Sequence, residues 1–179
     1  MRKIPHPINV KSKPSKEEFS RMKRSPIYLI LDNIRSLYNV GAMFRTADAC
    51  LVEKIYLCGI TGTPPRKEID KTALSTVEFV PWEYREDVVE LCKELKEQGT
   101  QLVALEQCYE SVDYRKTDYS FPLALIVGHE IEGVNDQALK LCDMAISLPM
   151  LGMANSLNVA TACGISLYFL SDKYACRGK

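Results

Sequence analysis

Residues 148–170 read LPMLGMANSLNVATACGISLYFL, and the two halves of this stretch differ in character. The second half, Ala160 to Leu170, is apolar enough to predict a buried helix. The first half places polar and turn-forming residues among Met and Leu side chains: Pro149, Gly152, Asn155, Ser156 and Asn158. A buried amide or hydroxyl without a partner costs roughly 1–3 kcal/mol. The rest of the chain must therefore supply partners for these groups.

Strand-like and helix-like patterns alternate along the chain before this stretch. Strands are predicted at residues 25–32, 54–60, 75–82, 101–107, 122–128 and 144–149, and helices at 39–52, 83–99, 135–142 and 160–170. The clearest helix is 83–99, where Val88, Leu91 and Leu95 face inward and Gly99 is the C′ stop. Parallel strands need crossover connections. The alternation therefore predicts an α/β fold, a parallel sheet in an α/β/α sandwich.

The composition is typical of a single globular domain. The chain has 179 residues, of which 46% are hydrophobic and 26% charged. No apolar run approaches the ~18 residues of a membrane span, and the N-terminus has no apolar segment of a secretory signal. Seven cysteines without a Cys-x-x-Cys pair and only two histidines favour reduced thiols over disulfides or a metal site. We expect a cytoplasmic protein without metal or membrane association.

The net charge of zero conceals an uneven distribution. Residues 1–26 hold eight of the 23 basic residues and two of the 23 acidic ones. The division predicts a basic N-terminal arm, residues 1–26, on a mildly acidic domain, residues 27–179. Such an arm is typical of contact with a polyanion such as nucleic acid. A solvated tail explains the charge equally well, so charge alone leaves both interpretations open.

Polar residues and glycines gather after four of the predicted strands. In an open α/β sheet, ligands bind outside the carboxyl ends of the strands, which predicts one site built from several loops. The residues concerned are Asn33, Asn39, Gly41 and Arg45 after the first strand, Glu106 and Gln107 after 101–105, His129, Glu130, Glu132 and Gly133 after 122–128, and Gly152, Asn155, Ser156 and Asn158 after 144–149.

Several common sites are disfavoured by these loops. The segment GHEIEG (128–133) spaces two glycines like a phosphate loop, but Val134 and Asn135 replace the Lys-Ser/Thr pair. The chain has no G-x-G-x-x-G for a dinucleotide, and Ser156 has no His or Lys at a hydrolase spacing. Glu130 and Glu132 could be the carboxylate pair of a glycosidase, but the sequence shows neither an aromatic platform for a sugar nor a second acidic strand end beside them. A carboxylate that orients a basic group is the better functional interpretation, with Arg45 as the obvious partner, but for Glu132 a solvated glutamate in a turn is the more economical interpretation.

Three segments, taken in order, resemble motifs of the SpoU/TrmH family of RNA 2′-O-ribose methyltransferases, in the SPOUT superfamily. They are NVGAMFRTADA (39–49), LALIVGHEIEGV (123–134) and ISLPMLGMANSLNVATACGI (146–165). The last is similar to the family pattern I-P-M-x-G-x-x-x-S-L-N-V-[ST]-x-A. Each segment alone would be a weak signal, but the ordered set covers about residues 27–170.

The resemblance implies properties that periodicity could not predict. These are a deep trefoil knot in the C-terminal part of the chain, S-adenosylmethionine bound by the knot loops, RNA as substrate, and a homodimer whose interface helps to build the active site. It also implies a cofactor site at Leu105, Glu106, Gly128, Leu148, Met150, Ser156 and Leu157. The first half of 148–170 then becomes a ligand-binding loop in which Gly152 lets the backbone turn.

The catalytic residue implied by the resemblance is Arg45, supported by Asn39, Glu130, Ser156 and Asn158. A guanidinium has a pKa above ~12, so Arg45 is expected to contact the ribose 2′-hydroxyl or a phosphate and to stabilise the developing alkoxide. Family members often carry an additional RNA-binding domain, whereas here the basic arm and surface loops must select a tRNA or rRNA. A catalytically inactive knotted RNA-binding protein is the alternative function.

Overall fold

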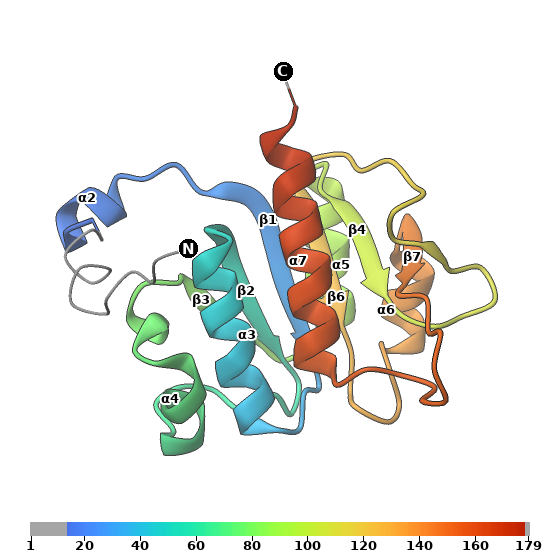
Figure 1. Ribbon diagram of the computed structural model, residues 1–179, viewed down its shortest axis with the longest axis horizontal. Helices are drawn as coiled ribbons and strands as arrows, with labels where there is room; N and C mark the ends of the chain where they lie inside the picture. The colour runs from blue at the N-terminus through green and yellow to red at the C-terminus, as the bar shows by residue number, and fades with distance from the viewer. Residues whose placement is uncertain (1–13, 178–179) are drawn as a thin grey trace, which may run out of the picture.

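One parallel sheet with helices on both faces forms the fold (Figure 1). The computed structural model describes residues 14–177. Its elements are α2 (Lys16–Ser20), β1 (Ser25–Asp32), α3 (Leu37–Ala49), β2 (Val52–Cys58), α4 (Lys67–Ala73), the 3-10 turn η1 (Thr76–Glu78), β3 (Trp82–Arg85), α5 (Val88–Glu97), β4 (Gln101–Leu105), β5 (Val112–Asp113), β6 (Leu123–Val127), α6 (Asp136–Leu141), β7 (Met144–Ser147) and α7 (Val159–Ala175).

The seven strands lie in the order β3-β2-β1-β6-β4-β7-β5, and every neighbouring pair is parallel. The first strand, β1, is therefore in the interior of the sheet, paired with β2 on one side and β6 on the other. Because all strands point the same way, the loops after β1, β4, β6 and β7 emerge at one edge. The predicted α/β fold is confirmed at this level.

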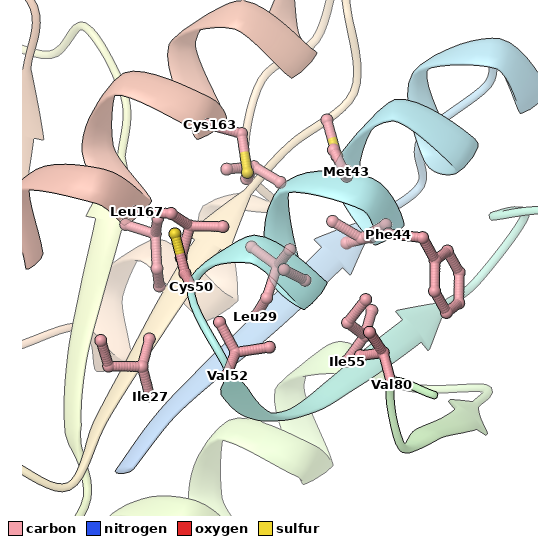
Figure 2. Close-up of a cluster of buried hydrophobic side chains, with 14 of the residues drawn as sticks. Ile27, Leu29, Met43, Phe44, Cys50, Val52, Ile55, Val80, Cys163 and Leu167 are labelled. Carbon is pink, nitrogen blue, oxygen red and sulfur yellow. The ribbon is translucent and has the colours of Figure 1, made fainter. Parts of the chain in front are cut away.

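Successive side chains of a strand point to opposite faces, and the two faces bury different helices. Ile27, Leu29 and Leu31 of β1 pack in one core with side chains of α3 and α7, as Figure 2 shows for part of that core. Ile30, on the other face, belongs to a second core with α5 and α6. The two cores make the structure an α/β/α sandwich, as predicted.

Helix α7 crosses back over the sheet from its β7 side. It contacts β4, β6 and β1 and packs against α3, and both helices lie in front of the sheet in Figure 1. Its buried side chains include Cys163, Leu167 and Leu170. Helix α7 thereby packs against α3 and β1, which lie more than 100 residues earlier in the sequence.

The prediction of a strand over 75–82 was wrong. Leu74 and Ser75 adopt left-handed conformations with φ of 50° and 69°, and the chain then makes the 3-10 turn η1. The strand of this region is β3, which begins only at Trp82, so the following helix begins at Val88 rather than at residue 83. Helix α4 and the two-residue strand β5 were not predicted.

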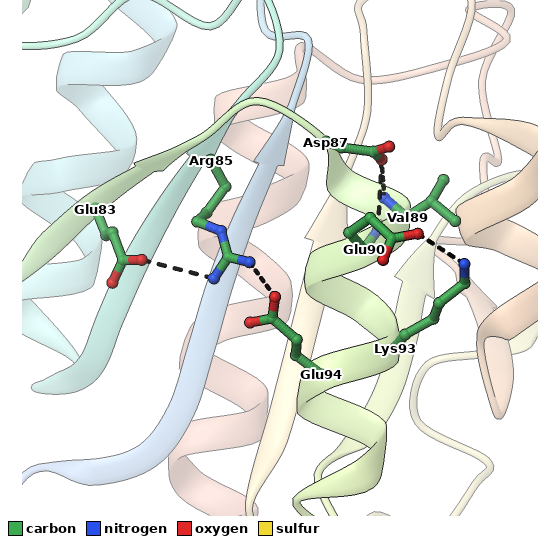
Figure 3. Close-up of polar contacts among 7 residues, drawn as sticks. All are labelled: Glu83, Arg85, Asp87, Val89, Glu90, Lys93 and Glu94. Carbon is green, nitrogen blue, oxygen red and sulfur yellow. Dashed lines mark hydrogen bonds and ion pairs between the residues drawn. The ribbon is translucent and has the colours of Figure 1, made fainter.

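The junction between β3 and α5 is held by polar contacts (Figure 3). The Asp87 carboxylate caps α5 by accepting a hydrogen bond of 2.7 Å from Val89 N. Arg85 forms ion pairs with Glu94 of α5 and with Glu83. The ion pairs of Arg85 and the Asp87 cap together hold the start of α5 in place.

The described part of the basic arm lies against the domain. The Phe19 ring of α2 packs edge-on against Phe79 with 5.8 Å between ring centroids. The Arg24 guanidinium donates to the carbonyls of Val52 and Phe79 at 3.1 and 2.6 Å. Strand β1 spans Ser25–Asp32, as predicted, so its first two residues fall within the range 1–26 that the sequence assigned to the arm. Residues 1–13 of the arm lie outside the described residues.

All seven cysteines are free thiols in the structure. Cys50, Cys58, Cys92 and Cys163 are buried and Cys176 is exposed. Within residues 14–177, no helix combines the length and apolar character that crossing a membrane requires.

Candidate active site

A pocket opens at the carboxyl ends of β4, β6 and β7, the edge at which the sequence predicted a site. We call it the strand-end pocket, and its cavity volume is about 390 Å³, within the range of small-molecule sites. All seven predicted cofactor residues line it. Its lining is Leu105, Glu106, Gln107, Val127, Gly128, His129, Glu130, Ile131, Glu132, Gly133, Ile146, Ser147, Leu148, Met150, Ser156, Leu157, Asn158, Val159 and Ala162.

Two glycines let the loop after β6 fold back on itself. His129 and Gly133 exchange backbone hydrogen bonds of 2.9 and 3.0 Å. A Cβ on Gly128 would lie 2.1 Å from the Gly133 carbonyl carbon, and Gly133 has a φ of +74°. A Cβ on Gly133 would also collide with the Glu106 carboxylate, so glycine is required by the close contacts and favoured by the positive φ. The GHEIEG segment is thus a tight turn that presents its backbone to the pocket, and it is no phosphate loop.

Two carboxylates from other strand ends hold this turn. The Glu106 Oε2 atom accepts a hydrogen bond of 2.8 Å from Val134 N, and the Asp32 Oδ2 atom accepts one of 2.7 Å from Asn135 N. Burial raises the pKa of Asp32, although its hydrogen bonds from Asn135 and Asn33 oppose that rise. Sequence reasoning missed Asp32, for which a polar residue ending a buried strand was the available signal.

Glu130 joins the loop after β6 to the start of α3. Its carboxylate accepts hydrogen bonds from the backbone N–H groups of Arg35 (3.0 Å) and Ser36 (3.1 Å) and from Asn39 Nδ2 (2.9 Å). Partial burial acts to raise the pKa of Glu130, but these donors outweigh it and hold the pKa below its ordinary value. Within this chain Glu130 does not form the predicted pair with Arg45, because the N–H groups of Arg35 and Ser36 just before α3 and the Asn39 amide occupy its carboxylate instead.

Asn39 and Asn158 connect α3 to α7. Asn158 Nδ2 donates to Asn39 Oδ1 at 3.1 Å, while Asn158 Oδ1 caps α7 by accepting from Ala160 N (3.0 Å) and Thr161 N (3.2 Å). Asn39 in turn donates to Glu130. Residues far apart in sequence thus form one chain of hydrogen bonds at the rim of the strand-end pocket.

The loop between β7 and α7 covers one side of the pocket. Ser156 lines the pocket, and the Asn155 carbonyl accepts a hydrogen bond of 2.9 Å from Gln107 Nε2. The side chains of Leu151 and Met153 are almost fully exposed, at 98% and 99%. Gly152 has neither a positive φ nor a neighbour that a Cβ would meet, so the structure shows no need for glycine at that turn.

Arg45 lies apart from the strand-end pocket of its own chain. It projects into a second cavity of about 520 Å³, the outer hollow, between α3, α4 and α7. Of the five predicted catalytic residues, the structure therefore brings Asn39, Glu130, Ser156 and Asn158 to the pocket and its rim, and leaves Arg45 outside. The outer hollow is lined by Ala42, Arg45, Thr46, Ala49, Lys71, Thr72, Leu74 and Tyr168.

The charges of the strand-end pocket restrict its ligand. Glu106, Glu130 and Glu132 line it, and its described lining contains neither Lys nor Arg. Cationic groups are what proteins place against phosphates, so a polyphosphate nucleotide does not fit. A ligand with a positive centre, an apolar ring system and groups that bond to backbone does fit. Residues 14–177 hold no cluster of His, Cys, Asp or Glu suited to a metal ion.

The sequence matches the SpoU rRNA Methylase family over residues 26–168. It is 34% identical over 152 residues to the tRNA (guanosine(18)-2′-O)-methyltransferase of Thermus thermophilus, an alignment covering 85% of this chain and 77% of that protein. The enzyme of the same name from Aquifex aeolicus is 34% identical over 151 residues, which cover 84% of this chain and 71% of its own.

Two solved structures extend the likeness to the fold. The crystal structure of the A. aeolicus TrmH/SpoU tRNA modifying enzyme superposes with a TM-score of 0.82 at 31% identity, over 91% of this chain and 85% of that one. The AdoMet-bound rRNA methyltransferase of Sinorhizobium meliloti gives 0.76 at 32% identity, over 82% of this chain and 56% of its own. The family match spans most of the chain, and relatives and structures agree with it; the chain belongs to the SpoU rRNA methylase family.

Proposed function

We propose that this protein is an S-adenosylmethionine-dependent methyltransferase that acts on a ribose 2′-hydroxyl of RNA. The observation that carries the proposal is the strand-end pocket, where the three family segments supply the lining or the rim. The relatives named above are tRNA 2′-O-methyltransferases, and a structure 32% identical to this chain contains AdoMet. Their names make a tRNA guanosine the first nucleoside to test.

The lining of the pocket suits S-adenosylmethionine. Leu105, Leu148, Met150 and Leu157 offer apolar surface for a purine ring, while the close turn at Gly128 exposes backbone donors and acceptors. The glutamates favour the positive sulfonium of this cofactor over an anion. When bound, S-adenosylmethionine supplies an electrophilic methyl group.

We assign a positioning role to Glu130, Asn39 and Asn158. Their hydrogen bonds fix the start of α3 and the start of α7 relative to the loop after β6. Methyl transfer depends on an in-line approach of the attacking oxygen, and such alignment contributes much of the catalysis. Ser156 lines the same pocket and is placed to contact the substrate.

We assign charge stabilisation to Arg45, acting at the pocket of a second copy. A homodimer is supported by α7, which is apolar around much of its circumference yet leaves Ile165 and Tyr168 exposed. A helix apolar on several sides is normally buried on several sides. A symmetric dimer through α7 covers this stripe and gives Arg45 a pocket to serve.

Complementation in trans tests this role of Arg45. We expect Arg45→Ala and Glu130→Ala each to lose methyl transfer, with S-adenosylmethionine affinity of Arg45→Ala within about twofold of wild type by calorimetry. Subunit exchange in a 1:1 mixture makes about half the dimers heterodimers, each with one intact site, so about a quarter of wild-type activity returns. No recovery, despite exchange seen by native mass spectrometry, contradicts action in trans.

The remaining family properties are also part of the proposal. The path of α7, which returns across β4 and β6 to α3, is compatible with a trefoil knot in the C-terminal part. Residues 1–26 serve as a basic arm for RNA and residues 27–179 as the methyltransferase domain. We also propose that the protein acts in the cytoplasm.

Radioactive methyl transfer tests the function as a whole. Tritiated S-adenosylmethionine is incubated with the protein and with fractionated tRNA or rRNA, and nuclease digestion maps the label. We expect label on a ribose 2′-oxygen. Label on a base, or none on any RNA, contradicts the proposal, and RNA binding without label would instead support the inactive RNA-binding protein.

A further inference from the structure

The three glutamates that line the strand-end pocket differ in how their charges are satisfied. Glu106 accepts hydrogen bonds of 2.8 Å from Val134 N and from Gln107 N, and Glu130 accepts three hydrogen bonds. The Glu132 carboxylate forms neither a hydrogen bond nor an ion pair with any residue in the range 14–177. Among the described lining residues, Glu132 is therefore the glutamate whose charge is left for a ligand.

The backbone of Glu132 is held in place by the turn after β6. Glu132 N and Ile131 N both donate to His129 Nδ1 at 3.2 Å, and the backbones of His129 and Gly133 close the turn. An imidazole that accepts at Nδ1 carries its only proton on Nε2 and is neutral. The histidine beside Glu132 therefore fixes the position of the glutamate without cancelling its charge.

The charge of Glu132 matches the net charge of the cofactor. The described lining of the pocket contains neither Lys nor Arg, and an uncompensated carboxylate in a cleft attracts a cationic ligand. The ammonium and carboxylate groups of S-adenosylmethionine offset each other, so its net positive charge is that of the sulfonium. The unpaired carboxylate of the pocket therefore favours the sulfonium.

Methyl transfer removes this positive charge. The bond between sulfur and the methyl carbon breaks and its electron pair stays on sulfur, the ribose oxygen forms a bond to the methyl carbon, and the hydroxyl proton passes to water. The product, S-adenosylhomocysteine, is a thioether without net charge. An attraction between opposite charges is lost with it, so an acidic pocket holds the product less tightly than the cofactor.

We propose that Glu132 determines the specificity of the strand-end pocket for charge, favouring the sulfonium of S-adenosylmethionine over the neutral sulfur of S-adenosylhomocysteine. This inference rests on the proposed function and deepens it, because it assigns the exchange of spent for fresh cofactor to one residue. Glu130 and Glu106, whose carboxylates are occupied by N–H groups, shape the pocket instead.

Removing the charge of Glu132 tests the proposal. Calorimetry without RNA measures the affinities of wild type and Glu132→Gln for both ligands, at about 0.05 M salt, where charges are weakly screened. An exposed pair of opposite charges contributes up to about fivefold in affinity. We expect Glu132→Gln to weaken S-adenosylmethionine binding about three- to fivefold and to leave S-adenosylhomocysteine binding within about 1.5-fold of wild type.

Glu110→Gln is the matched control, because Glu110 is an exposed glutamate of the loop after β4 that does not line the pocket. We expect it to bind both ligands within about 1.5-fold of wild type. Arg45→Ala removes the cation that the proposed dimer brings to the pocket, and it should keep the wild-type preference for S-adenosylmethionine. Circular dichroism establishes that each variant is folded.

A third ligand separates charge from shape. Sinefungin carries an ammonium group in the place of the methyl sulfonium, so we expect Glu132→Gln to weaken its binding as much as that of S-adenosylmethionine. Salt at about 1 M screens exposed charges. We expect the preference of wild type for the two cationic ligands to fall at that salt concentration to the value of Glu132→Gln.

Three outcomes overturn the inference and leave the proposed function standing, in a wild type that methylates RNA. Unchanged S-adenosylmethionine affinity of Glu132→Gln means that the carboxylate faces solvent. Equal weakening of S-adenosylmethionine and S-adenosylhomocysteine means that Glu132 supports the turn or contacts the ammonium group. Weakening of S-adenosylmethionine without weakening of sinefungin means that the methyl group, not the charge, is recognised.

A different result contradicts the proposed function together with this inference. That result is a wild type that binds none of the three ligands and methylates no RNA.

Discussion

The negative charge of Glu130 is stabilised by hydrogen bonds from N–H groups of another part of the chain. This explains why the carboxylate is not paired with a cation within the chain. Its three donors are two N–H groups at the start of α3 and the Asn39 amide. A carboxylate has only acceptors, whereas a neutral amide has one oxygen and two N–H groups. The Glu130 carboxylate can accept all three of these hydrogen bonds. We therefore expect its substitution to lower the rate of methyl transfer.

We expect Glu130→Gln to lower methyl transfer to RNA roughly tenfold, because the amide N–H groups face backbone donors that then lose their acceptor. The measurement is the initial rate at saturating S-adenosylmethionine, with circular dichroism to establish folding. Glu110→Gln, an exposed substitution on the loop after β4, is the control and should keep the wild-type rate. Equal rates for both variants would show that Glu130 does not position α3.

The lowered pKa of Glu130 gives its contribution a definite pH range. A carboxyl whose pKa is lower in the folded protein stabilises it above the ordinary value of about 4.3, and the contribution is lost as pH falls through the lowered pKa. We expect the stability difference between wild type and Glu130→Gln to be constant from pH 7 to about pH 5 and to shrink below about pH 4. Urea unfolding of both proteins across this range measures it. A difference that grows on acidification would give the opposite sign and contradict the assignment.

At the scale of elements, α7 depends on the residue that begins it. Asn158 caps two N–H groups of α7 and also bonds to Asn39 of α3. Loss of an N-cap side chain costs about 1 kcal/mol. We expect Asn158→Ala to lower the free energy of unfolding by about that amount or more, measured by urea denaturation.

Asn155→Ala provides the comparison for Asn158→Ala within the same loop. The Asn155 side chain makes no hydrogen bond with any residue of the described chain, and only its backbone carbonyl is used. Its replacement should change the free energy of unfolding by no more than about 0.5 kcal/mol. Equal destabilisation by the two substitutions would mean that the cap contributes nothing measurable.

The strands of the sheet interior were predictable because their apolar runs are continuous, as β6 shows with five consecutive buried residues. The structure of the region from Lys67 to Val80 was not predictable from the sequence. Helix α4 buries only Ile69 and Ala73, too few positions to display a helical period. The apolar residues Val77, Phe79 and Val80 fit a strand equally well, and only the left-handed backbone at Leu74 and Ser75 decides against it.

At the scale of the whole molecule, the cysteines report on the integrity of both cores. Burial raises the pKa of Cys50 to about 11 and those of Cys92 and Cys142 to about 12. Only the thiolate reacts with disulfide reagents. In the native protein at pH 8, we expect Ellman's reagent to modify the exposed Cys176 quickly and the buried thiols only after unfolding. Peptide mapping identifies which cysteines have reacted. Rapid modification of Cys92 in the native protein would mean that the core with α5 opens readily.

The candidate site was predictable to the extent that its residues follow strands. The strand ends predicted where the site lies, because parallel strands end at the same edge. The seven cofactor residues, which the family resemblance implies, also line the strand-end pocket. The position of Arg45 was not predictable from its place in sequence. It lies six residues after Asn39 on the same helix, but the turn of the helix carries it to the face shared with α4 and α7.

The interior position of β1 has a consequence for how the molecule is made. The ribosome synthesises β1 early, but one of its two neighbours, β6, is made about 100 residues later, and Asn39 meets Asn158 across 119 residues. Contacts between distant residues form slowly, since long loops must close first. A nascent chain therefore carries an open edge of β1 until β6 has been made, and its binding site is incomplete until α7 is added. The arrival of α7 thus decides when the strand-end pocket is complete.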